Sequence, residues 1–162
     1  MQFQKSIIIN ADADTVWGVV AHEFDRVGEW SSAVQSSGIN AEAPVPEGAT
    51  VGGRVCATDF GDLKETFTAY DEAKKQFTFR VTGMPSFITL AQNTVRVQPR
   101  GAGSEVSLNI QMETNAIGKV MGPMFAIKLK NTLNTFLDEL KDYVETGSLS
   151  SRKTKQLAKA AA

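Results

Sequence analysis

The side chains able to do nucleophilic or metal chemistry are few in this sequence. Cys56 is the only cysteine and His22 the only histidine, so a Cys/His zinc cluster cannot form and no His–carboxylate pair can be placed for nucleophilic catalysis. Because no motif activates its thiol, Cys56 is expected to be a small core residue. His22 closely follows the first expected helix, where a positive charge suits the helix end or solvent, and a role as general base is the alternative.

Glu65 is the carboxylate on which a catalytic hypothesis can be built. Alternation along its expected strand points its side chain to the same face as Phe67. A glutamate buried there without a partner would tend to become neutral and could act as an acid. The alternative is a register shifted by one residue, which would turn Glu65 towards water. Its possible partners are Arg54, Arg80 and Lys128, although these residue types are usually solvated surface charges.

Hydrophobic periodicity predicts the elements that must position these residues. Residues from Phe3 to Ile9 are typical of a strand, and Asp12 or Asp14 can cap a helix that contains Trp17. A short second helix is expected from Glu23 to Trp30. Strands separated by Gly, Pro and Asp turn residues then follow at 33–43, 53–60, 63–72, 76–83, 87–98 and 104–113.

The last expected element is a helix from Met121 to Thr146, which ends at Gly147. Its apolar stripe is formed by Leu133, Phe136, Leu137, Leu140 and Val144. Since short connections favour antiparallel neighbours, we predict an α+β helix-grip fold. It would have a curved antiparallel sheet of about seven strands, wrapped around the long C-terminal helix, with two short helices after the first strand.

Composition and charge limit the class of partner. The 162 residues suit one domain, 1–147, and the net charge of −1 does not direct the chain to nucleic acid or to an anionic membrane. Residues 148–162 carry Arg152, Lys153, Lys155 and Lys159. They are expected to form a flexible basic tail, with an RNA or membrane contact as the alternative. A single cysteine and an apolar run too short to insert in a membrane favour the cytoplasm.

The two ends of the predicted sheet differ in character. Connections in a meander alternate between the ends, and one end gathers large apolar residues on its loops and at the start of the last helix. These residues are Trp30, Phe60, Met84, Phe87, Met121, Met124 and Phe125. The concentration indicates the mouth of a pocket, whereas closure of an ordinary core is the alternative.

The inner face of the sheet follows from the strand at 104–113. If Val106, Leu108, Ile110 and Met112 face inward, the same phase in the earlier strands turns a mainly apolar set inward, with few polar groups. That set includes Phe67, Phe79, Phe87 and the polar residues Glu65, Thr89 and Asn93. A β-bulge would invert part of this assignment. Together with the residues of the mouth, these are the predicted ligand-binding residues.

Several segments together resemble the START/polyketide-cyclase-like superfamily, also called SRPBCC or the helix-grip fold. The usual opening of that family is a strand, an acidic or proline corner, a Val-Trp pair and a helix leading to a tryptophan. Val16-Trp17 and Trp30 occupy those places within SIIINADADTVWGVVAHEFDRVGEW. Three more segments match: EGATVGGRV from Glu47, VRVQPRGAGSEVSLNIQME from Val95, and LNTFLDELKDYVE in the last helix. The resemblance covers residues 1–147.

The resemblance implies a cavity under the long helix. Members of the superfamily bind lipids, sterols, quinones, polyketides or plant hormones there, and some are aromatase/cyclases. Its Rieske oxygenases need iron-binding histidines that this chain lacks, and no pattern specific to its co-chaperone branch is present. Because the fold hosts unrelated functions, the resemblance is more specific for fold than for activity.

The favoured hypothesis is binding or transport of a hydrophobic small molecule, such as a lipid, a quinone or a polyketide-like aromatic, without a cofactor. The second is a cofactor-free polyketide cyclase, aromatase or dehydratase, in which Glu65, Asn93 and Arg80 would position and protonate the substrate. A third is a protein-interaction module that uses the mouth or the tail, with an unspecified protein partner.

Overall fold

The computed structural model describes residues 1–162 and has the predicted order of elements. Strand β1 (Gln2–Ile9) leads into α1 (Ala13–Trp17), a π-helical turn η1 (Gly18–His22) and a 3-10 helix η2 (Phe24–Glu29). The remaining strands are β2 (Val34–Ile39), β3 (Gly53–Thr58), β4 (Gly61–Asp71), β5 (Gln76–Thr82), β6 (Ile88–Arg100) and β7 (Gly103–Thr114). Two helices follow, α2 (Gly118–Thr146) and α3 (Ser151–Ala160).

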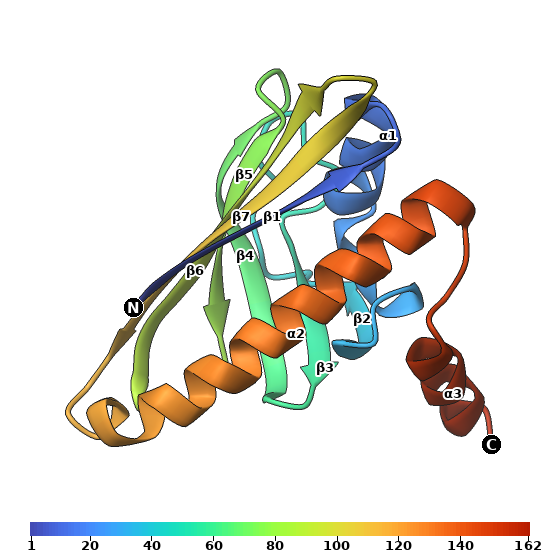
Figure 1. Ribbon diagram of the computed structural model, residues 1–162. Helices are drawn as coiled ribbons and strands as arrows, with labels where there is room; N and C mark the ends of the chain where they lie inside the picture. Colours follow the sequence, from blue (N-terminus) through green and yellow to red (C-terminus); the bar gives the residue numbers. More distant parts are fainter.

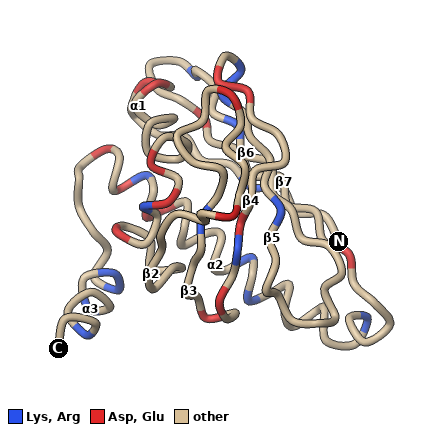
Figure 2. Tube along the Cα trace, turned by 180° about the vertical axis from the view of Figure 1, so that it is seen from behind, with Lys and Arg blue, Asp and Glu red and all other residues tan.

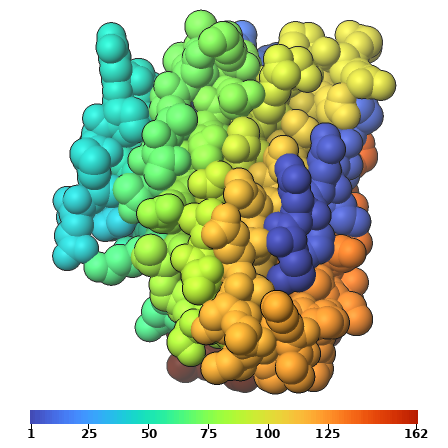
Figure 3. All heavy atoms as spheres, turned by 90° about the vertical axis from the view of Figure 1, so that its left-hand side faces the viewer, coloured from blue at the N-terminus to red at the C-terminus, as the bar shows by residue number.

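The seven strands form one antiparallel sheet in the order β1-β7-β6-β5-β4-β3-β2. The first strand pairs with the last, and their bands lie side by side in Figure 3. Strand β2, with which the meander begins, lies at the opposite edge of the sheet. The sheet curves around α2, which crosses its concave side (Figure 1). The predicted helix-grip architecture is therefore confirmed.

The phase predicted for the last strand is also confirmed. Val106, Leu108, Ile110 and Met112 are all at most 6 % exposed and belong to one core cluster with residues from α1, η2 and α2. Their strand neighbours on the opposite face are half-buried or exposed. This alternation places one apolar face of the sheet beneath α2 and leaves the other to solvent.

Local interactions fix the start of α1 and the end of α2. The Asp12 carboxylate accepts a hydrogen bond from the Thr15 backbone N–H at 2.8 Å and so caps α1. Helix α2 stops at Gly147, whose φ of 69° is left-handed and suits glycine. Near its end, Glu145 accepts from the Asn10 N–H at 2.7 Å, which holds α2 against the corner after β1.

Two predicted boundaries are wrong. Strand β2 ends at Ile39 rather than at residue 43, because the Ala43 N–H turns back to the Asn40 carbonyl at 3.1 Å, just before Pro44. Helix α2 begins at Gly118, three residues before the expected start at Met121 (121 − 118 = 3). In the extra turn Gly118 is buried, where a Cβ atom would meet the Thr114 side chain.

Residues 148–162 were expected to be a flexible tail, but the structure has helix α3 there, near the start of β2 and below the end of α2 (Figures 1 and 2). The Ser150 hydroxyl caps α3 by accepting from the Lys153 N–H at 3.0 Å. The Lys153 side chain is fully buried, and its ammonium donates to the Val34 carbonyl at 2.9 Å. Lysine can bury its aliphatic stem in this way, which composition alone does not reveal.

Neither α2 nor any other helix of the chain combines the length and the apolar character needed to span a membrane.

Candidate functional site

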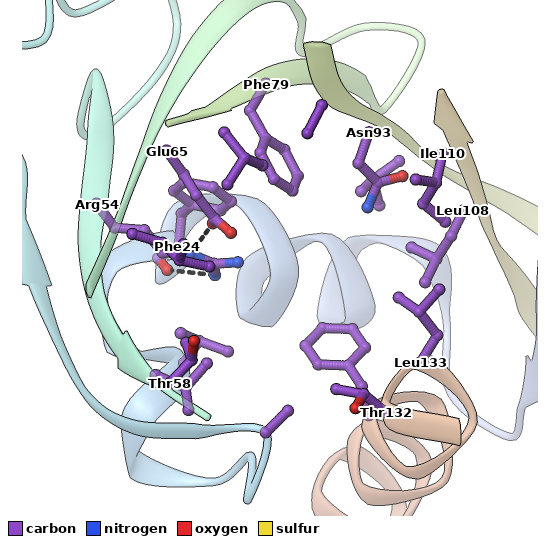
Figure 4. A pocket seen from close by; sticks show the side chains of 18 of the residues that line it. Phe24, Arg54, Thr58, Glu65, Phe79, Asn93, Leu108, Ile110, Thr132 and Leu133 are labelled. Atoms are coloured by element: carbon purple, nitrogen blue, oxygen red, sulfur yellow. Dashed lines mark hydrogen bonds and ion pairs between the residues drawn. The ribbon is translucent and has the colours of Figure 1, made fainter. Parts of the chain in front are cut away.

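The inner face of the sheet and α2 enclose a cavity of about 160 Å³ (Figure 4). Of the 28 residues that line it, 22 are hydrophobic, so its walls are apolar with a few polar groups. Apolar cavities of about 150 Å³ are large enough to hold a benzene-sized molecule. The space is therefore sufficient for a small apolar ligand.

The deep wall of the cavity is aromatic. Phe77 and Phe79 point inward from β5, and Phe24 approaches them from η2 with ring centroids 5.5 Å and 5.4 Å away. Alternation along β5 turns both of its phenylalanines to the same face, and all three residues are at most 5 % exposed. These tightly packed rings form a rigid apolar surface.

The apolar residues predicted at one end of the sheet form another part of the lining. Trp30, Phe60 and Met84 line it, and the Trp30 ring packs against Phe136 of α2 at 5.1 Å between centroids. Phe60 and Met84 are only partly buried. The cavity therefore approaches the surface at the β3–β4 and β5–β6 turns, as expected for a mouth.

Arg54 and Glu65 form the charged part of the lining. Glu65 lies on the inner face and is 8 % exposed, and its carboxylate accepts a hydrogen bond from Arg54 Nε. Arg54 Nη1 donates to the Phe24 carbonyl at 2.9 Å, and its guanidinium carbon lies 3.9 Å from the centroid of the Phe24 ring. Glu65 is thus paired with a buried cation, and it is not the unpartnered acid of the catalytic hypothesis.

The other two proposed partners of Glu65 lie elsewhere. Arg80 is exposed on the outer face of β5. The ammonium of Lys128 donates to the Asp59 carbonyl at 3.2 Å and lies 4.5 Å from the centroid of the Phe60 ring. Neither residue lines the cavity.

Asn93 is the polar residue of the lining whose side chain makes no hydrogen bond within the protein. It projects from β6 between apolar neighbours, across the cavity from Arg54 and Glu65 (Figure 4). Its Oδ1 atom is buried and has no hydrogen-bond partner. An unpaired buried carbonyl oxygen calls for an explanation, and a ligand is one.

Thr89 and Phe87 do not line the cavity, contrary to the predicted phase of their strand. The pairing of β6 with β7 shifts between Ile88 and Leu90, so that Thr89 occupies a β-bulge and is exposed. The bulge reverses the face of the sheet to which the preceding side chains point. Phe87 instead packs edge-on against Phe125, with ring centroids 5.7 Å apart.

Three predicted residues of α2 and one of β4 are also outside the lining. Met121 and Met124 are 47 % and 71 % exposed, because they lie on the face of α2 turned away from the sheet. Phe125 packs beside Phe60, outside the cavity, at 5.1 Å between centroids. Phe67 is buried but lies behind the Phe24 ring, 4.5 Å from its centroid.

Sequence reasoning missed the α2 residues that do face the cavity. They are Leu129, Thr132, Leu133 and Phe136. The signal was present in the helical spacing of the apolar stripe, which extends towards the start of the helix through Leu129 rather than through the methionines. Met121 and Met124 were predicted instead because methionine adapts to ligands of varied shape.

A second polar cluster lies outside the cavity, in the turn after β4. Glu72 accepts hydrogen bonds from Trp17 Nε1 at 2.8 Å and from the Tyr70 hydroxyl at 2.7 Å, and it pairs with His22 Nε2 at 2.8 Å. Burial alone would raise the pKa of Glu72, but these three bonds outweigh it and lower the pKa. Burial and the bond to Glu72 raise the pKa of Tyr70. The chain therefore does contain a His–carboxylate pair, which sequence spacing gave no means to find.

Cys56 is not activated as a nucleophile, and the acidic side chains do not form a metal site. Burial raises the pKa of the Cys56 thiol to about 12, an effect that the charge of Arg54 opposes only in part, so the thiol is protonated at neutral pH. No group of three or more His, Cys, Asp or Glu side chains is arranged to hold a metal ion.

Solved structures with the same fold are numerous at low sequence identity. A START superfamily protein from Mycobacterium smegmatis has a TM-score of 0.72 at 17% identity, over 91% of this chain and 99% of that one. The protein XoxI from Bacillus cereus has a TM-score of 0.67 at 18% identity, over 88% and 94%. A point mutant of norcoclaurine synthase from Thalictrum flavum, in complex with a transition-state analogue, has 0.65 at 16%, over 89% and 93%. No curated protein is significantly similar to the chain by sequence.

A family model described as polyketide cyclase/dehydrase and lipid transport matches residues 1–145. That span contains every strand of the sheet, α1 and nearly all of α2, and it leaves α3 outside. Because the match covers most of the chain and agrees with the observed fold, this protein belongs to the polyketide cyclase/dehydrase and lipid transport family.

Proposed function

We propose that the protein binds or transports a hydrophobic small molecule in the cavity between the sheet and α2, within the domain formed by residues 1–147. The single observation that carries the proposal is the cavity of about 160 Å³, whose lining is hydrophobic at 22 of 28 positions. A cavity of that composition is typical of sites for small apolar ligands. We place this activity in the cytoplasm, on the reduced state expected of one buried cysteine.

Apolar burial can supply the affinity. At about 25 cal/mol per Å², a ligand that hides roughly 300 Å² of apolar surface gains about 7 kcal/mol before ordering costs. That gain corresponds to a Kd of about 10 μM before ordering costs, without any ion pair between ligand and protein. This matches a lining in which the charges of Arg54 and Glu65 already compensate each other.

Native mass spectrometry of freshly purified protein, followed by extraction under denaturing conditions, tests the proposal. We expect an added mass that is released on denaturation. Leu133→Trp should abolish it, because Leu133 lines the cavity and the larger side chain would fill the space. Asn134→Trp is the matched control, because Asn134 is the next residue on α2 and is exposed. Retention of the added mass in Leu133→Trp would contradict binding in this cavity.

An enzymatic cyclase or dehydratase is the second candidate, and the charged pair within the cavity favours it. Glu65 Oε2 is bound to Arg54, whereas Oε1 makes no hydrogen bond within the protein and is free to exchange a proton with a substrate. The family description names cyclases and dehydrases, and one structural neighbour is a synthase. Incubation of the protein with a polyketide-like chain would test turnover, and Glu65→Gln should abolish it while leaving binding in place. Absence of turnover in the unmodified protein would leave the binding function alone.

A further inference from the structure

The side chains of Thr58, Gln92 and Thr132, which also line the cavity, make hydrogen bonds within the protein. Two other polar spots in the lining keep hydrogen-bonding capacity that the protein does not use. The first is Asn93. No hydrogen bond within the protein uses its side-chain amide, and its Oδ1 atom is buried without a partner. Ala91 and Val95, which flank it on the same face of β6, are apolar and 5 % exposed. An acceptor left in such surroundings is costly unless a ligand group donates to it.

The second spot is the pair of Arg54 and Glu65. Arg54 uses Nε and Nη1, and Glu65 uses Oε2. Arg54 Nη2 and Glu65 Oε1 make no hydrogen bond within the protein and are left for a ligand. Because the two charges compensate each other, this spot offers a donor and an acceptor without net charge.

Strand pairing sets the separation of the two spots. Glu65 on β4 lies opposite Val81 of β5, and Asn93 on β6 lies opposite Phe79 of β5. The two residues are thus two strand spacings apart across the sheet and two residues apart along it. With strands about 4.8 Å apart and about 3.4 Å per residue, their Cα atoms are separated by about 12 Å. The side chains of Arg54, Glu65 and Asn93 enter the same cavity from its two sides (Figure 4).

We propose that the ligand is an uncharged apolar molecule, about two fused rings in length, with oxygen substituents at its two ends. A hydroxyl group at one end donates to Asn93 Oδ1, and an oxygen at the other end accepts from Arg54 Nη2. This inference rests on the proposed function and specifies the chemical class of the molecule that is bound. A carboxylate ligand is disfavoured, because the positive charge of Arg54 is already neutralised by Glu65 and a further buried anion would be unpaired.

Equilibrium dialysis with four probes of one ring system tests the assignment: naphthalene, 2-naphthol, 2,6-dihydroxynaphthalene and 2,6-naphthalenedicarboxylate. We expect 2-naphthol to bind about tenfold more tightly than naphthalene, the diol to bind more tightly still, and the dicarboxylate to bind more weakly than naphthalene. Asn93→Leu should remove the advantage of 2-naphthol and leave naphthalene binding in place. Leucine has the same number and branching of side-chain heavy atoms as asparagine and removes an unpaired polar group, so the variant should fold.

Thr94→Val is the matched control, because Thr94 follows Asn93 on β6, faces the other side of the sheet and pairs there with Thr78. It should keep the advantage of 2-naphthol. The double variant Arg54→Met/Glu65→Leu should remove the additional advantage of the diol over 2-naphthol. A 2-naphthol advantage that persists in Asn93→Leu, or tighter binding of the dicarboxylate than of the diol, would overturn the assignment. Failure of naphthalene itself to bind the unmodified protein would instead overturn the proposed function.

Discussion

At the residue scale, the buried pair of Arg54 and Glu65 is the feature on which the cavity most depends. The two residues are each 8 % exposed, and Arg54 also donates to the Phe24 carbonyl of η2 and stacks on the Phe24 ring. One guanidinium thus joins β3, β4 and η2 around the deep wall. Removal of one charge from a buried pair leaves the other uncompensated, which costs more than the pair itself is worth.

We therefore predict that Arg54→Met lowers the free energy of unfolding by about 3–5 kcal/mol, measured by urea denaturation. The double variant Arg54→Met/Glu65→Leu should recover part of that loss, because no unpaired charge remains. Arg80→Met, which removes an exposed arginine from the outer face of β5, should change stability by less than about 0.5 kcal/mol. Equal losses in the single and double variants would show that the apolar contacts of Arg54, and not its charge, hold the site.

The lowered pKa of Glu72 predicts how the stability of the protein depends on pH. Its pKa is lowered in the folded protein by the bonds from Trp17, Tyr70 and His22, relative to an ordinary value of 4.5. A carboxyl group with a lowered folded-state pKa contributes stability that is present above the ordinary value and is lost as the pH falls through the lowered one. Because Glu72 is partly exposed, solvent screening limits the size of this contribution.

Glu72→Gln should accordingly destabilise the protein at pH 7, and the difference from the unmodified protein should shrink as the pH falls from 5 to 3. Urea unfolding curves measured across that range would check this. Glu47→Gln, a change of an exposed glutamate in the loop before β3, is the control and should show no such trend. A difference that stays constant with pH would mean that the hydrogen bonds matter and the charge does not.

At the scale of elements, α3 is an addition that locks one wall of the cavity. Lys153 and Glu139, both buried, hold the segment after η2 from two sides. Lys153 donates to the Val34 carbonyl at 2.9 Å, and Glu139 accepts from the Ser32 N–H at 2.7 Å. Val34 lines the cavity, so the docking of α3 acts on the site through the backbone of this segment. Burial lowers the pKa of Lys153, while the charge of Glu139 opposes that shift.

We predict that Lys153→Glu releases α3, because it places a second negative charge in the buried surroundings of Glu139. Hydrogen–deuterium exchange of the α3 amides, measured by mass spectrometry, should become at least about tenfold faster, and the segment 32–34 should lose protection with it. Lys159→Glu makes the same change of charge on the exposed face of α3 and should leave both segments protected. Unchanged exchange in Lys153→Glu would show that α3 does not depend on this contact.

At the scale of the whole molecule, a cavity enclosed by the sheet on one side and α2 on the other couples ligand binding to folding. A ligand that binds only the folded state adds about 2.7 kcal/mol to the free energy of unfolding at a hundred times its Kd. We expect 2-naphthol at that concentration to raise the urea midpoint of the unmodified protein. Leu133→Trp should respond little and Asn134→Trp fully. An equal response in both variants would place the ligand outside the cavity.

The sequence by itself determined the architecture. Period-two alternation in β7 and the apolar stripe of α2 specify which faces are buried, and short connections specify antiparallel neighbours, because these are properties of nearby residues. For the same reason the inward orientation of Phe79 and Asn93 could be predicted, as could a cap at Asp12 or Asp14, of which the structure uses Asp12, and the stop at Gly147.

Only the tertiary structure decided the details of the site. The bulge at Thr89 reverses the inward and outward positions that simple alternation predicts for the residues before it. One extra residue in a strand does not change the composition, so the sequence does not reveal the bulge. The partner of Glu65 depends on the register of β3 against β4, which chose Arg54 over Arg80 and Lys128. The burial of Lys153 depends on a carbonyl 119 positions away in the sequence. Contacts of this kind are made by packing between distant segments, and local sequence patterns do not encode them.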